Sequence, residues 1–482
     1  MNKCIALCLL PWLLTGCKEL PGPLAELQHI RWMLPVAKEL PVTEETSEAV
    51  TSEVVDTKPL ASPVKEISTA GLTAWLVEDH SLPLVSVQLV FKGAGSSSDP
   101  EDKTGRAMFA AALLDEGAGD LDALSFQQAL EDKAIQLSFG VDEDVLVVNL
   151  RTLSEHLPEA FRLIGLALNQ PRFDIQDIKR KRASALSRLR ESKTKPGFVL
   201  AKTFNAMAYP DHPYSAQPLG SEASLSHMAQ SDLERYVNQV LTKDRLLISV
   251  TGDVKADRLT ELMETHLGAL SETSLMPEPE SITLKHQGVM VVEELDIPQS
   301  HVLVATPTIA RDDERFMAAF VLNHIIGGDT FTSVLGSAIR EEKGLAYSVM
   351  SYLDPMSHSS AFKVRFATRN EEAHVAYETL KAELTKVAEA GVSEEQFNNA
   401  IDYITGSFIL SLDNNTNYTR YLGTMQRFDL GKEYLQTRNQ KMRQVTREQV
   451  NELAKDMFDP DKWLTVVVGK PDKLESGPKA SQ

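Results

Sequence analysis

Cysteine is almost absent from this chain of 482 residues, which contains only Cys4, Cys8 and Cys17. No cysteine follows residue 17, so the remainder can form no disulfide and can offer no thiol as a metal ligand or nucleophile. The chemistry of this protein must therefore rest on other side chains.

Closely spaced histidines are also missing. The chain has eleven histidines, and no two of them are closer than fifteen residues. A zinc-binding pair on one helix requires two imidazoles about one turn apart, so that both reach the same ion. The sequence likewise lacks a glycine-rich phosphate loop ending in Lys-Ser or Lys-Thr, and it lacks a Gly-x-Ser-x-Gly nucleophile elbow.

Positive charge is scarce overall, because 49 Lys and Arg residues face 68 Asp and Glu residues and leave a net charge of −19. Such a surface argues against a nucleic-acid partner. The segment 179–195 is a basic exception that could attract acidic partners or lipid headgroups. We interpret it as the solvated face of a helix, whose inward-facing residues are Ile178, Ala185, Leu186 and Leu189.

Long apolar runs are missing too, since the longest candidate, Ile5–Leu14, is too short to span a bilayer. It follows Lys3 and ends in Leu14-Thr15-Gly16-Cys17, an order that resembles the bacterial lipoprotein signal. The resemblance implies that residues 1–16 are removed and that Cys17 carries lipid. Lys18 favours an outer-membrane lipoprotein that faces the periplasm of a Gram-negative bacterium.

Residues 17–65 are rich in Pro, Glu, Thr and Ser and are typical of an extended tether.

From residue 66 onward, strand and helix patterns occur in the same order twice. We expect an α+β fold made of two homologous α/β-sandwich domains, with helices packed on one face of each sheet. The predicted domains are 66–270 and 285–472, joined by a proline-containing linker at 271–284 and followed by a tail at 473–482. Each predicted domain ends in a similar strand, at 246–252 and 463–469.

The segment 323–353 predicts a helix followed closely by a strand. Gly327-Gly328 leads into a helix at 330–342 that Asp329 or Thr330 could cap. Its apolar face is predicted from the helical spacing of Phe331, Val334, Leu335, Ala338 and Ile339. Gly344 suits a left-handed stop before a strand at 345–353. Arg340 and Tyr347 therefore flank one sharp turn.

These features together resemble the pitrilysin/insulinase family of metallopeptidases, the inverzincins, over roughly residues 66–470. Gly105–Leu114 occupies the place of the His-x-x-Glu-His helix of that family. The other matching stretches are Val90–Gly95, Leu114–Gly117, His212–Tyr214, Pro218–Gly220, Thr251–Asp253, Asn323, Gly327–Gly328, Arg340–Glu341 and Gly344–Tyr347. The implied architecture is a duplicated, peptidase-like half clamshell.

The departure from the family pattern concerns the zinc site. Met108 and Ala112 stand at the positions of the two zinc histidines, and Ala111 stands at the position of the general base. The third zinc ligand of the family is a glutamate on a later helix, and residues 179–190 contain none. A thioether and two methyl groups cannot hold zinc or activate its water. We therefore expect no cofactor in this chain.

Two-chain members of the family divide the work, with zinc on one subunit and an Arg/Tyr pair on the other. The resemblance implies that Arg340 and Tyr347 bind the substrate backbone, as two hydrogen-bond donors suited to a peptide carbonyl. It also implies a heterodimer with a zinc-bearing subunit of the same family and a peptide or small-protein substrate. Two alternatives remain: a scaffold or peptide-binding lipoprotein without a proteolytic role, and a self-sufficient peptidase with an unrecognised site.

Overall fold

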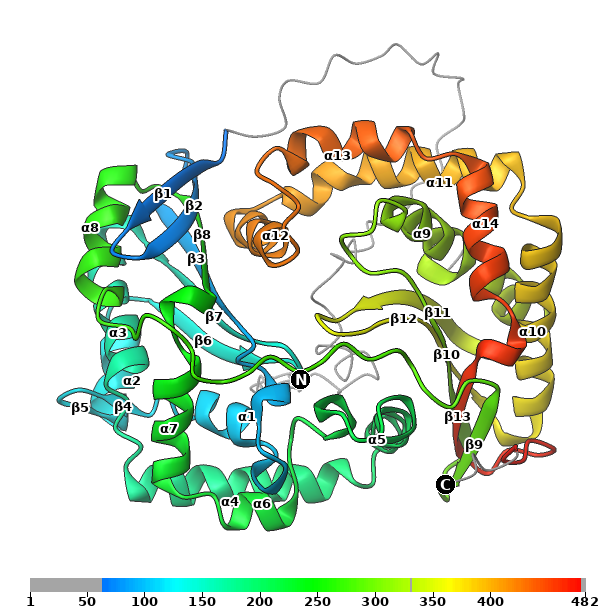
Figure 1. Cartoon of the computed structure of the whole chain (residues 1–482), viewed down its shortest axis with the longest axis horizontal. Helices are drawn as coiled ribbons and strands as arrows, with labels where there is room; N and C mark the ends of the chain where they lie inside the picture. Colours follow the sequence, from blue (N-terminus) through cyan, green and yellow to red (C-terminus); the bar gives the residue numbers. More distant parts are fainter. Residues whose placement is uncertain (1–62, 330–331, 478–482) are drawn as a thin grey trace, which may run out of the picture. The chain divides into compact units, whose positions relative to one another are not determined.

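The computed structural model describes residues 63–329 and 332–477 (Figure 1). Cys17, the predicted signal sequence and the tether up to residue 62 lie outside the described residues. Within the described part, none of the helices combines the length and the apolar character needed to cross a bilayer.

Two main β-sheets organise the described chain. The first has the strand order β1-β2-β8-β3-β7-β6, and the second has the order β11-β12-β10-β13-β9. The strands of the first sheet are β1 (Lys65–Thr69), β2 (Leu72–Glu78), β3 (Leu84–Lys92), β6 (Gln136–Val141), β7 (Val145–Leu153) and β8 (Leu246–Gly252). Those of the second are β9 (Val289–Glu294), β10 (Gln299–Pro307), β11 (Ala346–Pro355), β12 (Ser360–Arg369) and β13 (Leu464–Gly469). A small hairpin joins β4 (Gly117–Ala118) and β5 (Leu121–Asp122).

The two sheets repeat one topology. β8 runs parallel to β2 and antiparallel to β3, and β13 runs parallel to β9 and antiparallel to β10. The next two strands, β7 and β6 in one sheet and β12 and β11 in the other, also pair in the same antiparallel sense. The similar segments 246–252 and 463–469 correspond to β8 and β13. The predicted α+β fold with two homologous halves is therefore confirmed.

Helices of the first half cover one face of the first sheet. They meet the alternate side chains Val85, Val87, Leu89 and Phe91 of β3, which belong to the core. This alternation is typical of a strand with two different faces. The helices of this half are α1 (Arg106–Ala111), α2 (Ala123–Glu131), α3 (Leu157–Asn169), α4 (Ile175–Ser192), α6 (Glu222–Ser226), α7 (Gln230–Val240) and α8 (Ala256–Leu267).

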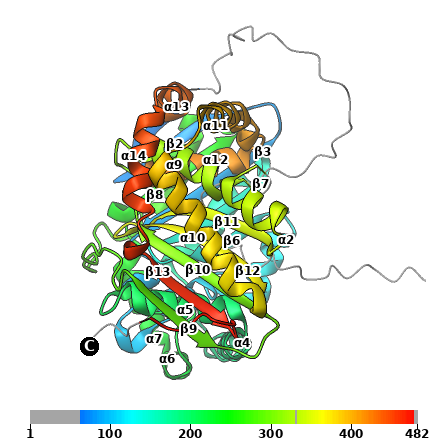
Figure 2. The same ribbon diagram turned by 90° about the vertical axis from the view of Figure 1, so that its right-hand side faces the viewer.

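The second sheet is covered in the same manner, and α10 lies over β10 and β12 (Figure 2). The helices of this half are α9 (Phe316–Asn323), α10 (Ala373–Ala390), α11 (Glu394–Ser407), α13 (Tyr434–Arg443) and α14 (Arg447–Met457). A π-helical turn, η7 (His324–Gly328), extends α9, and a second one, η8 (Gly336–Glu342), precedes β11.

Two helices are exchanged between the halves. α5 (Pro196–Ala208) packs Leu200 and Phe204 against β10 and β13 of the second sheet. α12 (Asn415–Arg427) lies on β3 and β8 of the first sheet, on the face opposite to its core. There, Gln426 Nε2 donates to Ser249 Oγ at 2.6 Å, and a Cβ at Gly423 would come within 2.1 Å of Gln88 Oε1. Each half thus completes the sheet packing of the other.

A buried polar cluster fastens this exchange. Arg427, at the end of α12, binds Asp142 at 3.0 Å and Asp144 at 3.1 Å, both on the turn between β6 and β7. Asp144 also accepts hydrogen bonds from the Ser357 amide at 2.7 Å and from the Tyr214 hydroxyl. The Asp144 residue is only 3% exposed. Segments far apart in the sequence therefore share one buried carboxylate.

Candidate functional site

The turn between η8 and β11 brings Arg340 and Tyr347 together. Gly344 adopts φ +60°, and its amide donates to the Arg340 carbonyl at 3.1 Å. The amide of Leu345 donates to the Ile339 carbonyl at 2.9 Å. These bonds satisfy carbonyls at the end of the helix, and the left-handed backbone is the conformation that glycine adopts with little strain. The predicted glycine stop is confirmed.

The beginning of this helix differs from the prediction. The described helical residues begin at Val334, with Thr332 in a turn, and continue as the π-helical η8. Ser333 Oγ accepts from the Gly336 amide at 3.2 Å, so Ser333 is the observed cap. Asp329 ends η7 and lies five residues before Val334, so the cap of the described helix is Ser333 and not Asp329. Thr330 and Phe331 lie outside the described residues.

Tyr347 occupies an irregularity in the edge strand β11. The pairing of β11 with β12 shifts between Ala346 and Val349, so Tyr347 lies on a β-bulge. Bulges re-aim side chains and occur often beside functional sites. Tyr347 is 88% exposed, and the Arg340 guanidinium carbon lies 5.6 Å from the centre of its ring. This is cation–π distance. The structure therefore places a guanidinium beside an exposed phenol.

Polar contacts clamp the turn from neighbouring elements. Thr368 Oγ1, on β12, donates to the Leu345 carbonyl at 2.5 Å. Lys343 Nζ donates to Thr379 Oγ1, on α10, at 2.9 Å. With both sides held, the pair needs little reorganisation to meet a ligand. The sequence did not reveal these clamps, because Thr368 and Thr379 lie far from the turn and carry no local motif.

A second anchor holds the middle of β11. Ser351 Oγ donates to Asn323 Oδ1 at 2.9 Å, and both residues are buried. A Cβ on Gly327 would come within 2.8 Å of the Ser351 amide, so glycine allows η7 to lie directly against β11. Asn323 and Gly327 belong to the stretches that carry the family resemblance. Here they position the strand that bears Tyr347.

The degenerate zinc positions lie on α1. Met108 is half-buried, Ala111 is buried and Ala112 is exposed at the end of the helix. Within residues 63–329 and 332–477, no three or more His, Cys, Asp or Glu side chains group closely enough to hold a metal ion. The residues on α1 do not fit zinc, since none of the three has a ligand atom suited to it.

The position of α1 is nevertheless firmly fixed. Asp99 accepts from the amides of Gly105 at 2.8 Å and Ala107 at 2.9 Å, and it therefore caps the helix. Arg106 lies 3.6 Å from the Asp99 carboxylate and donates to the Ser98 carbonyl at 2.8 Å. Burial raises the pKa of Asp99 to about 7, although these donors and Arg106 act in the opposite direction. The helix keeps its place without its metal ligands.

Basic side chains of α4 lie beside the end of α1. Glu116, shortly after α1, forms ion pairs with Arg180 and with Lys181, the latter at 2.6 Å. Burial opposes the effect, but these two cations lower the pKa of Glu116 overall. The predicted inward face of α4 is confirmed, because Ile178 and Leu189 are buried in the core.

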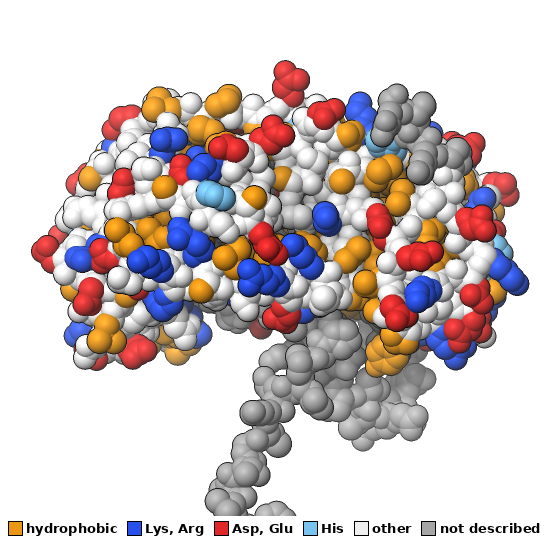
Figure 3. Space-filling model, turned by 90° about the horizontal axis from the view of Figure 1, so that it is seen from below, with side chains coloured by type: hydrophobic (Ala, Val, Ile, Leu, Met, Phe, Trp, Pro, Cys, Tyr) orange, Lys and Arg blue, Asp and Glu red, His pale blue; other side chains and the backbone are white. Residues whose placement is uncertain are grey.

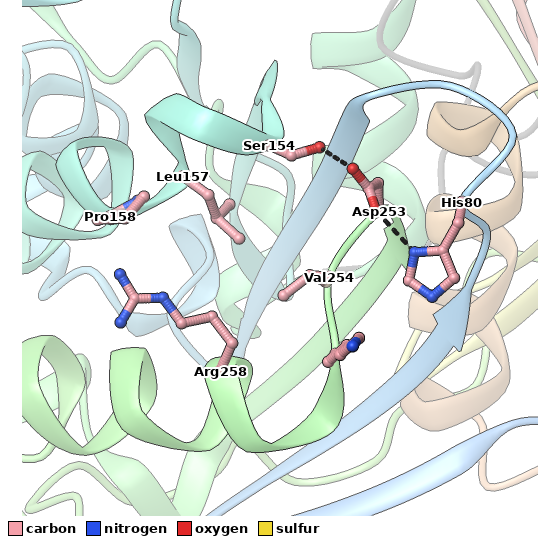
Figure 4. A pocket seen from close by; sticks show the side chains of 8 residues that line it. His80, Ser154, Leu157, Pro158, Asp253, Val254 and Arg258 are labelled. Atoms are coloured by element: carbon pink, nitrogen blue, oxygen red, sulfur yellow. Dashed lines mark hydrogen bonds and ion pairs between the residues drawn. The ribbon is translucent and has the colours of Figure 1, made fainter.

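A separate pocket brings His80, Asp253 and Ser154 together (Figure 4). Asp253 lies between the other two and contacts His80 Nδ1 at 2.6 Å and Ser154 Oγ at 2.7 Å. In a Ser-His-Asp triad the histidine contacts the serine directly as its base. Here the carboxylate separates them, so this cluster is not a Ser-His-Asp catalytic triad.

Comparison with known families gives a consistent result. The family model described as "Insulinase (Peptidase family M16)" matches residues 74–221, and the one described as "Peptidase M16 inactive domain" matches residues 228–404. The chain belongs to the insulinase family, peptidase family M16. The missing zinc-site residues make it a member of the inactive, pseudo-peptidase type.

Some related proteins are named as proteases, and one is named as a non-peptidase. The chain is 25% identical over 397 residues to the "Non-peptidase homolog YmxG" of Helicobacter pylori, and the match covers 81% of this chain and 90% of that protein. It is 26% identical over 374 residues to an uncharacterized zinc protease of Mycobacterium leprae, covering 77% and 84%.

Solved structures of the family share the fold. A peptidase M16 inactive domain from Pseudomonas fluorescens superimposes with a TM-score of 0.77 and 24% identity, covering 85% of this chain and 98% of that one. The periplasmic protease PqqL of Escherichia coli gives a TM-score of 0.73 and 17% identity, covering 91% of this chain but 49% of PqqL. The predicted family and fold class are thereby confirmed.

Proposed function

We propose that this chain is the non-catalytic subunit of a heteromeric zinc metallopeptidase of the insulinase family. This proposal rests on one contrast between the two halves. α1 offers no ligand for zinc, whereas Arg340 and Tyr347 lie together on a turn that is held by hydrogen bonds from neighbouring elements. In this proposal, zinc and the general base reside on a partner chain of the same family. This chain supplies peptide-binding donors.

The chemistry of the pair fits this role. The Tyr347 hydroxyl and the Arg340 guanidinium are both hydrogen-bond donors, and a peptide carbonyl is an acceptor on which negative charge grows during hydrolysis. The exposure of Tyr347 leaves the phenol accessible to a peptide, while Arg340 beside it adds positive charge. One preorganised donor of this kind typically contributes about 10²–10³ in rate.

The test uses this chain together with a zinc-bearing family member that copurifies with it. Arg340→Ala and Tyr347→Phe should each lower peptide turnover about 10²-fold or more, with unchanged thermal stability. Arg151→Ala and Tyr403→Phe are matched controls, because both residues are exposed and lie outside the turn. Unchanged turnover in the Arg340 and Tyr347 variants would reject the assignment. Stoichiometric zinc in the purified chain alone would contradict the absence of a metal site.

A scaffold or peptide-binding protein without a proteolytic role is the second candidate, and the non-peptidase name of the Helicobacter pylori relative favours it. Copurification with partners that all lack a zinc motif would support this alternative. It would also leave peptide binding, but not turnover, dependent on Tyr347.

The proposed location is the periplasmic face of the outer membrane, with Cys17 as the lipidated N-terminus. The lipoprotein-like segment 14–17 supports this, and so does the structural relative PqqL, which is described as a periplasmic protease. Metabolic labelling with palmitate should mark the wild-type chain in membrane fractions. Cys17→Ser should abolish the label, and a labelled Cys17→Ser chain would refute lipidation at this residue.

A further inference from the structure

The exposed face of α4 is strongly basic in an otherwise acidic protein. α4 contains six basic and two acidic side chains, whereas the whole chain has a net charge of −19. Figure 3 shows Lys and Arg side chains gathered across the face of the molecule that carries α4. The basic residues of α4 are Lys179, Arg180, Lys181, Arg182, Arg188 and Arg190.

The neighbouring carboxylates do not neutralise this face. Glu116 pairs with both Arg180 and Lys181, and Asp177 is a second partner of Arg180 at 2.9 Å. Glu222 pairs with both Arg190 at 3.9 Å and Lys193 at 2.8 Å. The remaining basic residues of interest are Lys179 and Arg188 on α4 and Lys202 on α5. Among the described residues, these three form no ion pair, and all of them are exposed. An excess of positive charge therefore faces solvent.

The basic face ends at a pocket of about 680 Å³. Leu189 and Lys193 of α4 line the pocket together with Phe198 of α5 and Val291 of β9. The pocket lining contains two lysines and two glutamates, Lys193, Lys202, Glu222 and Glu293, and of these Lys193 pairs with Glu222. Its volume lies in the range typical of ligand sites, and its walls suit an apolar side chain.

We propose that α4 and this pocket bind an acidic peptide segment that also carries a large apolar residue. Carboxylate side chains would lie over Lys179 and Arg188, and the apolar side chain would enter the pocket beside Phe198. This inference rests on the proposed function, because it names the class of peptide that the subunit would bind. It adds a recognition surface near the emptied zinc helix, where Arg180 and Lys181 already hold Glu116.

A peptide fits these observations better than a membrane surface does. The middle of the exposed face carries the small residues Ala183, Ser184 and Ser187. Ile175 is a large exposed apolar residue of α4, but it lies at the first residue of the helix, so no large side chain stands among the basic residues for insertion among lipid tails. Membrane-surface helices depend on such insertion together with basic charge. The pocket at the end of the basic face can bind a single side chain of a peptide, whereas the flat surface of a bilayer cannot fill it.

The test measures fluorescence anisotropy of labelled twelve-residue peptides with the full chain at low salt. One peptide combines glutamates with one phenylalanine, a second replaces the glutamates by glutamines, and a third replaces the phenylalanine by alanine. The first should bind at least about tenfold more tightly than the second, and added salt should remove most of this difference. The third should bind several-fold more weakly than the first.

The double variant Lys179→Glu/Arg188→Glu should lose the preference for glutamates. Lys255→Glu/Lys441→Glu is the matched control: it changes the net charge equally, and both lysines are exposed and form no ion pair among the described residues. If both double variants lost the preference for glutamates equally, the preference would come from the net charge of the protein, and the proposed site would be refuted. Circular dichroism of each variant checks that it folds.

Two further outcomes are decisive. Equal binding of the glutamate and glutamine peptides would overturn the proposal. Binding to phosphatidylglycerol vesicles that depends on Lys179 and Arg188, without peptide binding, would assign this face to a membrane instead. Arg340→Ala, measured both in this binding assay and in the turnover assay with the zinc-bearing partner, separates the two proposals. Loss of turnover with an intact preference for glutamates would concern only the Arg340–Tyr347 site.

Discussion

Asp144 provides the sharpest test of how the two halves are joined. Its carboxylate accepts from the Ser357 amide at 2.7 Å, from Arg427 at 3.1 Å and from the Tyr214 hydroxyl. Asp144→Ala would leave the buried Tyr214 hydroxyl without its acceptor and would remove one of the two carboxylates bound by Arg427. Removing one partner of a buried ion pair typically costs about 3–5 kcal/mol. Asp142 remains as a partner for Arg427, so we expect about 3–4 kcal/mol.

The measurement is equilibrium unfolding in urea, followed by the fluorescence of Trp75 on β2 and Trp463 next to β13, which report on the two halves. Arg427→Met should be similarly destabilising. The double variant should cost about 2 kcal/mol less than the two single effects combined, since the residues share one network. This non-additivity distinguishes a specific pair from general disruption of the core.

The matched control is Asp402→Ala. Asp402 lies 3.7 Å from Arg443, but its side chain is 77% exposed. Exposed pairs of this kind contribute about 0–1 kcal/mol. If Asp144→Ala cost no more than Asp402→Ala, or if the Asp144 and Arg427 variants were strictly additive, the proposed role of this buried carboxylate in joining the halves would be refuted.

Three other predictions concern the same elements. Burial, reinforced by Asp142 and Asp354 and opposed by Lys363, raises the pKa of Glu143 to about 7. The folded state therefore holds this proton more tightly than the unfolded state, and stability should fall as the pH rises from about 4.5 to about 7. Glu143→Gln should accordingly be more stable than the wild type by about 3 kcal/mol at pH 8, with little difference in the free energy of unfolding at pH 4. An equal difference at both pH values in urea titrations would exclude this origin. Gly344→Ala should lower the free energy of unfolding by about 1 kcal/mol. The positive φ alone causes this loss, since the added Cβ would meet no atom within 4 Å. An unchanged stability in thermal unfolding would show that the turn relaxes. Thr368→Val should cost about 1–2 kcal/mol by leaving the Leu345 carbonyl without its donor, and it should lower turnover with the partner more than Thr379→Val does, because it acts on the backbone next to Tyr347.

The sequence predicts elements well where one face is strongly apolar. The apolar spacing of residues 373–390, 157–168 and 177–191 indicates three helices, and the structure shows them as α10, α3 and α4. Their apolar side chains recur at helical spacing because only one face of each helix packs on the core of its half. The strands β8 and β13 were predicted for a related reason: both are buried on two faces and read as continuous apolar runs.

The exchanged helices could not be predicted in this way. α12 carries few apolar residues, and Gly423 in its middle disfavours a helix in isolation. Its helical conformation depends on a polar sheet face supplied by distant strands, where Gln88 and Ser249 are buried. α5 begins with Pro196-Gly197 and packs on a sheet that forms mostly from residues after 288. The helical conformation of both segments depends on tertiary contacts, and the local spacing of apolar residues does not reveal such contacts.

The candidate site was predicted only in part. The turn containing Arg340, Gly344 and Tyr347 follows from local signals, because a charged helix end and a glycine stop are sequence features. The β-bulge at Tyr347 and the clamp from Thr368 depend on the register of β11 against β12, which no local pattern specifies. The distance between the guanidinium and the phenol ring is therefore information that only the fold provides.

The retention of α1 bears on what the first half still does. A buried pair such as Asp99 and Arg106 is costly to desolvate and contributes little net stability compared with apolar packing. It does, however, fix the start of α1, through the amides of Gly105 and Ala107. A helix whose only task was to fill space could be held by apolar contacts alone. The fixed position of α1 beside the basic face of α4 therefore favours a remaining role for this surface in binding, as opposed to a relic of lost catalysis. Asp99→Asn separates the two possibilities: if α1 still serves binding, this variant should weaken acidic-peptide affinity beyond its effect on stability, whereas a relic would lose stability alone.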